Sequence, residues 1–587
     1  MGNGEEMMDN RTKEMNEKVL EAMKKSSYEA LHALDESTVN AVSANKELLH
    51  TILSDSCDTE YGRKYHFSEI KDADEYRRMV PLTTYDDYEA YIDRMTEQGE
   101  ENLLTGYPVV YYASTSGTSG SPKKIPVSDR GLAVFRNYAS SVMLAIISEF
   151  YKDTAYEDAP AGFRMTMASF SRKPLPCGVD FGSISAACMT EKSIEMLPYI
   201  MSTPRDVMFC SDNADLKYLH ARYGLMNRDI VYFTGAYIPA LLDMANYIIE
   251  NWEMLTDDIR NGKIDASVQM PDELRKTLED SLKPDPERAD ELEKEFEQGF
   301  GNNILKRIWP KLSAVSAIWA GNFHSYARRL QDSFTGRSIP FYTMSYASSE
   351  GIFGVARHPF DQYYCMIPKS CFFEFIPMDG KGADTEEENP KTLLMDELED
   401  GKEYELVITN QSGFYRYRMG DVIKVIGFYN ETPMIVFKYR KKNIVSIAGE
   451  KFTEDHLLSA VREFERRSGV NIIDFCMYPD RDVVPARYVI LLEPEKVVPK
   501  ERLAECQNIL SEELARASTS YAHYVMGGNM GEPKIVFLQQ QVFALHRELK
   551  MYKMGLSENQ LKTPRVLSTP ELIAFFQSQA EQYQDKE

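Results

Sequence analysis

The most informative stretch of this sequence is Ser114-Thr115-Ser116-Gly117-Thr118-Ser119-Gly120-Ser121-Pro122-Lys123. An apolar run at 108–112 precedes it and predicts a strand, and Ser128-Asp129 after it predicts the start of a helix that runs to about Phe150. Glycines let such a loop turn sharply and approach a ligand, and its N–H groups, hydroxyls and lysine can hold phosphate oxygens. The order is not that of a Walker A loop, G-x-x-x-x-G-K-S/T. The setting therefore favours a phosphate-binding loop of another kind over a flexible Ser/Gly surface loop.

Two later motifs strengthen this interpretation. They read Tyr342-Thr-Met-Ser-Tyr346-Ala347-Ser348-Ser349-Glu350-Gly351 and Tyr415-Arg-Tyr417-Arg-Met-Gly-Asp421-Val422. In order and spacing, the three motifs resemble those of the Gretchen Hagen family of auxin-responsive acyl acid–amido synthetases. This family is a branch of the acyl-adenylate-forming superfamily, which also includes acyl-CoA synthetases and luciferases. Further similar segments at 251–262, 283–290 and 559–565 extend the resemblance over about residues 15–575.

The order of predicted elements indicates the architecture. From about 100 to 436, apolar β-type runs alternate with amphipathic helices, which is typical of an α/β fold with largely parallel sheets. The resemblance implies a large N-terminal adenylate-forming domain with mixed or parallel sheets and flanking helices, at 1–440, and a smaller mobile α+β C-terminal domain, at 441–587. In the latter we expect helices at 453–467 and 500–516 and strands near 472–478, 486–492 and 534–538. Arg440-Lys441-Lys442-Asn443 resembles the superfamily's hinge, without the hinge Asp.

The resemblance also implies ATP and Mg²⁺ as cofactors and assigns residues to them. Ser116 and the rest of the loop would cover the β- and γ-phosphates, Glu350 would bind Mg²⁺, and Asp421 would accept the ribose hydroxyls. Lys562 would contact the reacting carboxylate and the α-phosphate, unless it is a solvated lysine or serves the second step. Ser116, Glu350 and Lys562 are the catalytic candidates, and the implied ATP or AMP site comprises Ser114, Thr115, Ser116, Gly117, Thr118, Ser119, Gly120, Lys123, Tyr346, Ala347, Ser348, Ser349, Tyr417, Asp421 and Arg440.

The pocket for the acyl acid is less well defined. By analogy with the family it lies between the helix after the phosphate loop, the strand and turn at 232–236, and the segment at 319–324. Its aromatic side chains suggest an aryl or other apolar acid, although for each one alone a place in the core is favoured over contact with the ligand. The candidates are Phe135, Tyr138, Phe233, Gly321 and His324.

The amino-acid composition limits the classes of partner that this protein is expected to bind. The 587 residues predict two to four structural units, and 67 basic against 91 acidic residues give a net charge of −24. That charge argues against nucleic acid or an anionic membrane as the main partner. The eight scattered cysteines lack zinc spacing, the N-terminus has no signal-peptide pattern, and no transmembrane helix is expected. We therefore expect a cytoplasmic monomer that acts on small molecules.

The motifs serve adenylation, so the second step rests on the resemblance. The favoured hypothesis is an ATP-dependent acyl acid–amido synthetase, which adenylates a small carboxylic acid and transfers the acyl group to the amine of an amino acid. An alternative is an acyl-CoA or carrier-protein ligase with the same first step. A third is a nucleotide-binding regulatory protein that has lost its chemistry. The joint presence of Lys123, Glu350, Asp421 and Lys562 argues against the third.

Overall fold

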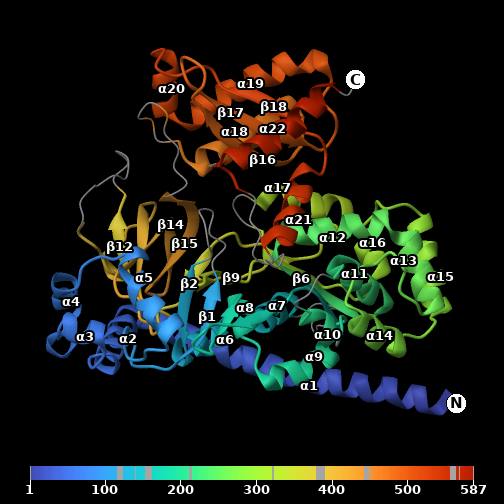
Figure 1. Ribbon diagram of the computed structural model, residues 1–587, viewed down its shortest axis with the longest axis horizontal. Coiled ribbons are helices and arrows are strands. Elements are labelled where there is room, and N and C mark those ends of the chain that lie inside the picture. Colours follow the sequence, from blue (N-terminus) through green and yellow to red (C-terminus); the bar gives the residue numbers. More distant parts are fainter. Residues whose placement is uncertain are drawn as a thin grey trace.

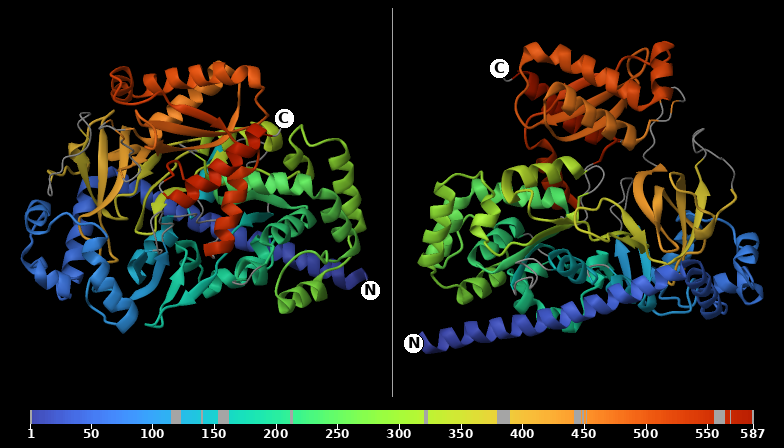
Figure 2. Two further views of the ribbon diagram at one scale, coloured as in Figure 1. Left: turned by 45° about the horizontal axis from the view of Figure 1, so that its top comes forward. Right: turned by 180° about the vertical axis from the view of Figure 1, so that it is seen from behind.

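The computed structural model describes residues 2–114, 123–138, 141–152, 162–210, 214–319, 323–378, 390–441, 447, 450, 452–554, 564–567 and 569–585. We call residues 2–440 the N-terminal body and residues 452–585 the C-terminal module. The module lies on top of the body in Figure 1, and helix α21 reaches down from it to the body. The long helix α1 (Gly2–Val39) runs along the side of the body opposite the C-terminal module (Figure 2, right). The predicted α/β fold class is confirmed.

The largest sheet of the body is antiparallel throughout. Its seven strands are ordered β12-β13-β14-β15-β11-β10-β9, and each hydrogen-bonded pair is antiparallel. The expectation of largely parallel sheets is wrong here, because hairpins rather than crossover helices connect most of these strands. The bounds are β9 (Ser345–Ser348), β10 (Gly351–Val355), β11 (Tyr364–Met366), β12 (Phe372–Pro377), β13 (Glu403–Thr409), β14 (Tyr417–Tyr429) and β15 (Thr432–Arg440).

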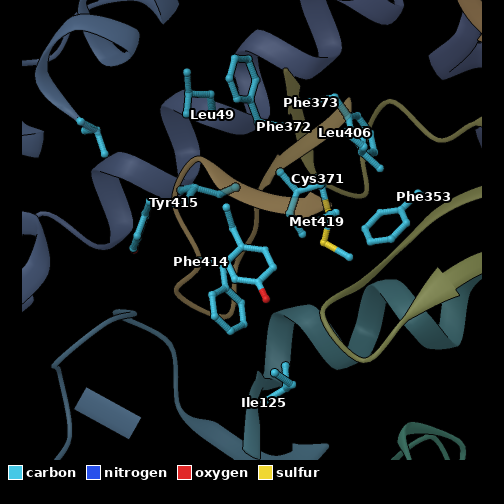
Figure 3. Packing of buried hydrophobic residues seen from close by; sticks show 14 of the residues in the cluster. Leu49, Ile125, Phe353, Cys371, Phe372, Phe373, Leu406, Phe414, Tyr415 and Met419 are labelled. Atoms are coloured by element: carbon cyan, nitrogen blue, oxygen red, sulfur yellow. The ribbon is translucent and has the colours of Figure 1, made fainter. Parts of the chain in front are cut away.

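Short helices and aromatic side chains cover this sheet. Figure 3 shows Leu49 of α2 (Ala41–Asp55) beside Phe372 of β12, within one buried cluster that also contains Phe414 and Tyr415. The Tyr415 ring stacks on Tyr61 with 5.0 Å between ring centroids. Such contacts fix the segment that leads into the third motif. The helices on this side are α3 (Glu60–Lys64), α4 (Ala73–Met79) and α5 (Asp86–Asp93).

A second sheet of the body is parallel, as the alternation of elements predicted. Its order is β3-β6-β7-β8, with β3 (Phe163–Met167), β6 (Ile230–Tyr237), β7 (Ala314–Ile318) and β8 (Phe341–Tyr342). Alternate side chains face opposite sides, because a strand has a period of two. One side packs against α11 (Leu216–Met226), α12 (Ile238–Glu250), α13 (Trp252–Asn261), α14 (Asp272–Ser281), α15 (Pro286–Glu297), α16 (Ile304–Ile308) and α17 (His324–Leu330).

The other side of the parallel sheet packs against α7 (Met143–Tyr151) and α1. Together with α6 (Asp129–Tyr138), α7 accounts for the helix predicted from 128 to 150. By length and mean hydropathy (1.3) the stretch Asp129–Tyr151 could cross a membrane, contrary to the expectation from sequence. Since 62% of its most apolar window is buried inside the protein, the hydropathy is that of a core element. Three short helices complete this side: α8 (Ile184–Ala187), α9 (Glu191–Ile200) and α10 (Arg205–Met208).

A third, mixed sheet holds the ends of the predicted phosphate loop. Its order is β2-β1-β5-β4, with β1 (Val109–Ser114), β2 (Lys124–Ser128), β4 (Arg172–Pro174) and β5 (Asp180–Gly182). The helix after the loop begins at Asp129, as predicted. A strand between the loop and the helix was not predicted: the loop joins two antiparallel strands, in which Ser114 pairs with Lys124. The run Lys124–Ser128 alternates too little in polarity to be recognised as a strand from sequence.

The C-terminal module combines one sheet with flanking helices. Its strands are ordered β16 (Ile472–Asp480), β17 (Arg487–Pro494) and β18 (Lys534–Phe537), and Val566 forms a parallel bridge with Met477 of β16. The helices are α18 (Glu454–Ser468), α19 (Leu503–Ala517), α20 (Thr519–Met526), α21 (Val542–Met554) and α22 (Pro570–Asp585). The elements predicted for this region are confirmed to within a few residues at their ends. The predicted domain boundary between residues 440 and 441 stays a prediction.

Candidate functional site

Asp421 lies at the centre of the candidate site, on β14. Its cross-strand neighbour on β15 is Arg440, whose Nε donates to Asp421 Oδ1 over 2.6 Å. The Tyr346 hydroxyl of β9 donates to Asp421 Oδ2 over 2.8 Å. Asp421 is only 2% exposed, whereas the Arg440 side chain is 42% exposed and covers it from the rim. The Asp421 charge raises the pKa of Arg440, so the Arg440 guanidinium is cationic at any physiological pH.

Local backbone geometry presents Asp421 in this way. Gly420 has φ +70, a conformation that favours glycine, and it directly precedes the carboxylate. Arg418, two residues earlier, donates to Glu405 of β13 over 2.8 Å and 3.0 Å. Lys441, the first residue after β15, donates to the same Glu405 over 3.0 Å. The chain is therefore held on the sheet through Lys441, and the other two residues of the predicted hinge (440–443), Lys442 and Asn443, fall outside the described residues.

The second motif forms the hairpin between β9 and β10, next to the end of β1. Ser349 Oγ donates to the carbonyl of Ser114 over 2.9 Å, and the Asn410 side chain donates to the Glu350 carbonyl over 2.8 Å. Ala347 is exposed, and Ser348, Ser349 and Glu350 are half-buried. A cavity is lined by Ser349, Glu350, Asn410 and α6 residues, Phe135 among them. Within the described ranges, the Glu350 carboxylate makes no hydrogen bond or ion pair, and it remains free for a cation.

Two aromatic residues border the site. Tyr417 is 6% exposed and packs on Phe414 at 4.7 Å between ring centroids, so it is a core aromatic. Burial raises its pKa, and the Glu350 carboxylate nearby adds to that rise. The Lys123 ammonium, at the end of the loop, lies 4.2 Å from the centroid of the Tyr85 ring, a distance at which a cation is attracted to the ring face. The loop therefore ends in a lysine whose charge lies over an aromatic ring.

The acyl-pocket candidates do not all converge. Phe135 and Tyr138 of α6 are buried in the cluster between α7 and the parallel sheet, whose wall includes Tyr232. Phe233 points to the opposite side of that sheet and packs 5.9 Å from Trp309. The strand period explains why Tyr232 occupies the place predicted for Phe233. The prediction that Phe233 shares a pocket with Phe135 and Tyr138 is therefore wrong.

His324 begins α17, next to the C-terminal module. It is half-buried, and burial together with Arg462 and Arg328 lowers its pKa, so it is neutral at pH 7. The remaining candidates lie outside the described residues: Thr115, Ser116, Gly117, Thr118, Ser119 and Gly120 of the loop, Gly321, and Lys562. Their roles stay predictions.

Asn410 and the hydroxyl of Tyr346 take part in the site but were not predicted to make these contacts. Asn410 is 3% exposed, and its Oδ1 accepts from the backbone N–H groups of Ser412 and Phe414 while its amide holds the Glu350 carbonyl. The polar run Asn410-Gln411-Ser412 between a strand and an aromatic segment was the available signal. Nothing in the sequence shows that the Tyr346 hydroxyl reaches Asp421, because 75 residues separate them.

Comparison with known proteins identifies the family. The GH3 family N-terminal, central and C-terminal domains match residues 30–339, 364–440 and 455–571. The chain is 30% identical to a probable indole-3-acetic acid-amido synthetase, GH3.11, of Oryza sativa subsp. japonica, over 92% of this chain and 94% of that protein. It is 28% identical to a putative indole-3-acetic acid-amido synthetase, GH3.9, of Arabidopsis thaliana, over 94% and 96%.

A solved structure agrees with this result. The GH3.15 acyl acid amido synthetase superposes with a TM-score of 0.81 at 25% identity, over 94% of this chain and 95% of that one. The predicted resemblance is therefore confirmed, and the matched domains span most of the chain. This protein belongs to the GH3 family.

Proposed function

We propose that this protein is an ATP-dependent acyl acid–amido synthetase. It converts a small carboxylic acid to an acyl-adenylate and then transfers the acyl group to the amine of an amino acid. One observation carries the proposal: hydrogen bonds join all three motifs into one site. Ser349 of the second motif bonds to Ser114 at the start of the first, and Tyr346 of the second bonds to Asp421 of the third.

The chemistry explains why such a site is needed. A carboxylate resists attack by an amine, because its charge repels the nucleophile and its oxygen is a poor leaving group. Transfer of AMP from ATP turns that oxygen into part of a good leaving group and releases pyrophosphate. The protein has to position the two substrates, neutralise phosphate charge and exclude water. No covalent enzyme intermediate is required.

The described residues supply several of these functions. In the proposal, the Asp421 carboxylate accepts the ribose hydroxyls, and Arg440 moves aside or shares the carboxylate when the nucleotide binds. The 42% exposure of Arg440 allows that movement. Lys123, at the end of the loop, offers a positive charge to departing pyrophosphate. Ser116 and Lys562 are proposed for the phosphates and the reacting carboxylate on the basis of the family motifs.

Mg²⁺ is proposed at Glu350. Among the described residues, no group of three or more His, Cys, Asp or Glu side chains is arranged to hold a metal ion. A dedicated metal cage is not needed, because Mg²⁺ commonly takes one or two carboxylates together with water and substrate phosphates. Glu350 fits that mode, since its carboxylate has no hydrogen-bonding or ionic partner in the part of the chain that is described. When bound, the ion would neutralise phosphate charge.

The acid is proposed to be aromatic or otherwise apolar. Phe135 lines the cavity that Glu350 borders, and it belongs to a buried cluster that also contains Tyr138 and Tyr232. The two relatives compared above are named a putative and a probable indole-3-acetic acid-amido synthetase, and indole-3-acetic acid is an aromatic acid. The second step is proposed to require rotation of the C-terminal module about residues 440–443, which would exchange one face of the module for another at the site.

Pyrophosphate release against a library of carboxylic acids tests the proposal, with mixed amino acids, CoA or neither added. We expect release with one or a few apolar acids, amino-acid-dependent formation of an amide, and no thioester. Asp421→Asn, assayed in parallel, should lower the rate of release by about 10²-fold or more. A thioester formed with CoA would instead assign the protein to the acyl-CoA ligases, and a lack of release with every acid would contradict adenylation.

A further inference from the structure

A network of buried charges joins the C-terminal module to the N-terminal body. Its centre is Asp474 of β16, which is fully buried. Asp474 Oδ1 accepts from Arg565, which directly precedes the bridge-forming Val566, and Asp474 Oδ2 accepts from the hydroxyl of Tyr326 on α17 of the body. One carboxylate thus contacts both parts of the molecule.

Arg547 of α21 makes the second connection. Its Nη2 and Nε donate to Asp243 Oδ2 of α12 over 2.6 Å and 3.1 Å, and its Nη1 lies 3.3 Å from the Tyr326 hydroxyl and 3.9 Å from Asp474 Oδ2. The Arg547 side chain is 10% exposed. Figure 1 shows α21 inserted beside α12 and α17, where these contacts form.

Other contacts across the same interface are also polar. Gln541 donates to Glu250 over 3.0 Å, Lys217 pairs with Glu548 over 2.8 Å, and Arg328 pairs with Glu465 over 2.8 Å. Charged groups regain hydration when they separate, so an interface of this kind can open at lower cost than an apolar one. The charged contacts therefore suit a module that has to dock and leave repeatedly.

The positions of the two arginines connect this network to the reaction. Arg547 and Arg565 lie on either side of Lys562 in the sequence, and both are held by Asp474 or by its neighbours. Backbone hydrogen bonds of Met477 with Arg565 and Leu567 keep the segment after Lys562 alongside β16. A shift of Asp474 relative to Tyr326 and Asp243 would therefore shift both flanks of Lys562 together.

We propose that Asp474 and Arg547 are positioning residues that, through Tyr326 and Asp243, hold the C-terminal module in one of the orientations used in the two half-reactions. The role in catalysis rests on the proposed function, whereas the docking itself does not. Loss of a body-side contact releases the module, so one half-reaction slows more than the other. The four residues act through orientation and need not touch substrate.

Hydrogen–deuterium exchange of the full-length protein without ligands tests the docking. Tyr326→Phe and Asp243→Asn change only the body side of the network. Tyr218→Phe is the matched control, since Tyr218 donates to Asp258 over 2.6 Å in an equally buried pair that lies within the body. We expect exchange in α21 to rise about five- to tenfold in the two test variants. In the control, exchange should rise only around α11 and α13. Unchanged exchange of α21 in both test variants would overturn the proposal.

Half-reaction kinetics then test the positioning role, with the acid identified by pyrophosphate release. The rates of pyrophosphate release and of amide formation from preformed acyl-adenylate are measured separately for each variant. The ratio of the two rates should change about fivefold or more in Tyr326→Phe and stay constant in Tyr218→Phe. Equal changes in both steps would contradict positioning. If no acid supports release, the proposed function fails, and the exchange data still decide whether the network docks the module.

Discussion

Asp421 and Asp474 are two buried aspartates with the same local chemistry and different surroundings. Each accepts a tyrosine hydroxyl on Oδ2 and an arginine on Oδ1. The arginine at Asp421 has a side chain that is 42% exposed, whereas the one at Asp474 is 3% exposed. A ligand can therefore compete for Asp421 by displacing Arg440 into water. No such exchange is open at Asp474, where the arginine has no solvent to enter.

The comparison shows that the partners of a buried carboxylate do not reveal its role. Exposure of the cationic partner separates a carboxylate that could serve a ligand from one that serves the assembly of the protein. Substitutions at the two aspartates should therefore affect different properties. The following predictions test that distinction, in order of decreasing expected effect.

Asp474→Asn should have the largest effect on stability. Removal of the charge takes from the buried Arg565 guanidinium the carboxylate to which it donates, and breaking a buried pair in this way costs about 3–5 kcal/mol. Thermal unfolding followed by calorimetry should show a lower midpoint for the C-terminal module. Asp332→Asn, which breaks the exposed pair with Arg337, serves as the control and should change the midpoint little. A loss below about 1 kcal/mol at Asp474 would contradict this interpretation.

Asp421→Asn should affect activity more than stability. Two hydrogen bonds from the ribose to a charged acceptor are weakened, which predicts a loss of about 10²-fold or more in pyrophosphate release. The destabilisation should be smaller than at Asp474, because the exposed Arg440 can be rehydrated. The rate of pyrophosphate release and the thermal midpoint, measured on the same preparation, show whether activity falls more than stability does. Full activity would exclude a role of this carboxylate in nucleotide binding.

Glu493, close to Asp474, predicts a pH dependence. Burial raises the pKa of Glu493 from 4.5 to about 7, and the Asp474 charge adds to the rise. The Glu493 carboxylate also accepts hydrogen bonds from the backbone N–H groups of Gln541 and Phe543, which lower its pKa but do not offset the effect of burial. Because the folded state binds this proton more tightly than the unfolded state, the stabilisation is complete below pH 4.5 and is lost as pH rises through about 7.

Glu493→Gln isolates this contribution. The stability of the wild-type protein minus that of the variant should fall by about 2–3 kcal/mol between pH 4.5 and pH 8, since the variant lacks the titrating group. Chemical unfolding at several pH values measures the difference. A difference that does not vary with pH would mean that Glu493 does not titrate in this range.

Glu548→Gln should have the smallest effect. Glu548 pairs with Lys217 across the same interface as Arg547, but its side chain is 55% exposed. Exposed ion pairs contribute about 0–1 kcal/mol, so stability and the exchange of α21 should change little. A large effect would show that the rim of the interface, rather than its buried centre, holds the module.

Much of the candidate site could be predicted from sequence, because short motifs contain its polar residues. The GH3 family, the fold class and the amido-synthetase class are confirmed by the comparisons. The antiparallel pairing of the largest sheet was not predictable, since apolar runs such as Tyr404–Thr409 look alike in either kind of sheet. The face occupied by Phe233 depends on the register of β6, and a shift of one residue exchanges it with Tyr232.

The interdomain network could not be predicted for a different reason. Asp474 and Arg565 are 91 residues apart, and Asp243 and Arg547 are 304 apart. Each of these residues alone resembles an ordinary surface charge in an acidic chain. The docking of α21 beside α12 and α17 brings Arg547 to Asp243, and the bridge between Val566 and Met477 brings Arg565 to Asp474. Sequence patterns do not encode either arrangement locally.

The pairing of Asp421 with Arg440 in the β14–β15 ladder also defines where the chain can be lengthened. An extra residue inserted within β15 would turn Arg440 to the other face of the sheet and separate it from Asp421. An extra residue inserted after Lys441 would leave that register intact and lengthen only the connection to the C-terminal module. Tolerance to insertion should therefore change abruptly within two residues. The position after Lys441 is accordingly the natural place to splice in a reporter domain that senses how far the module has turned.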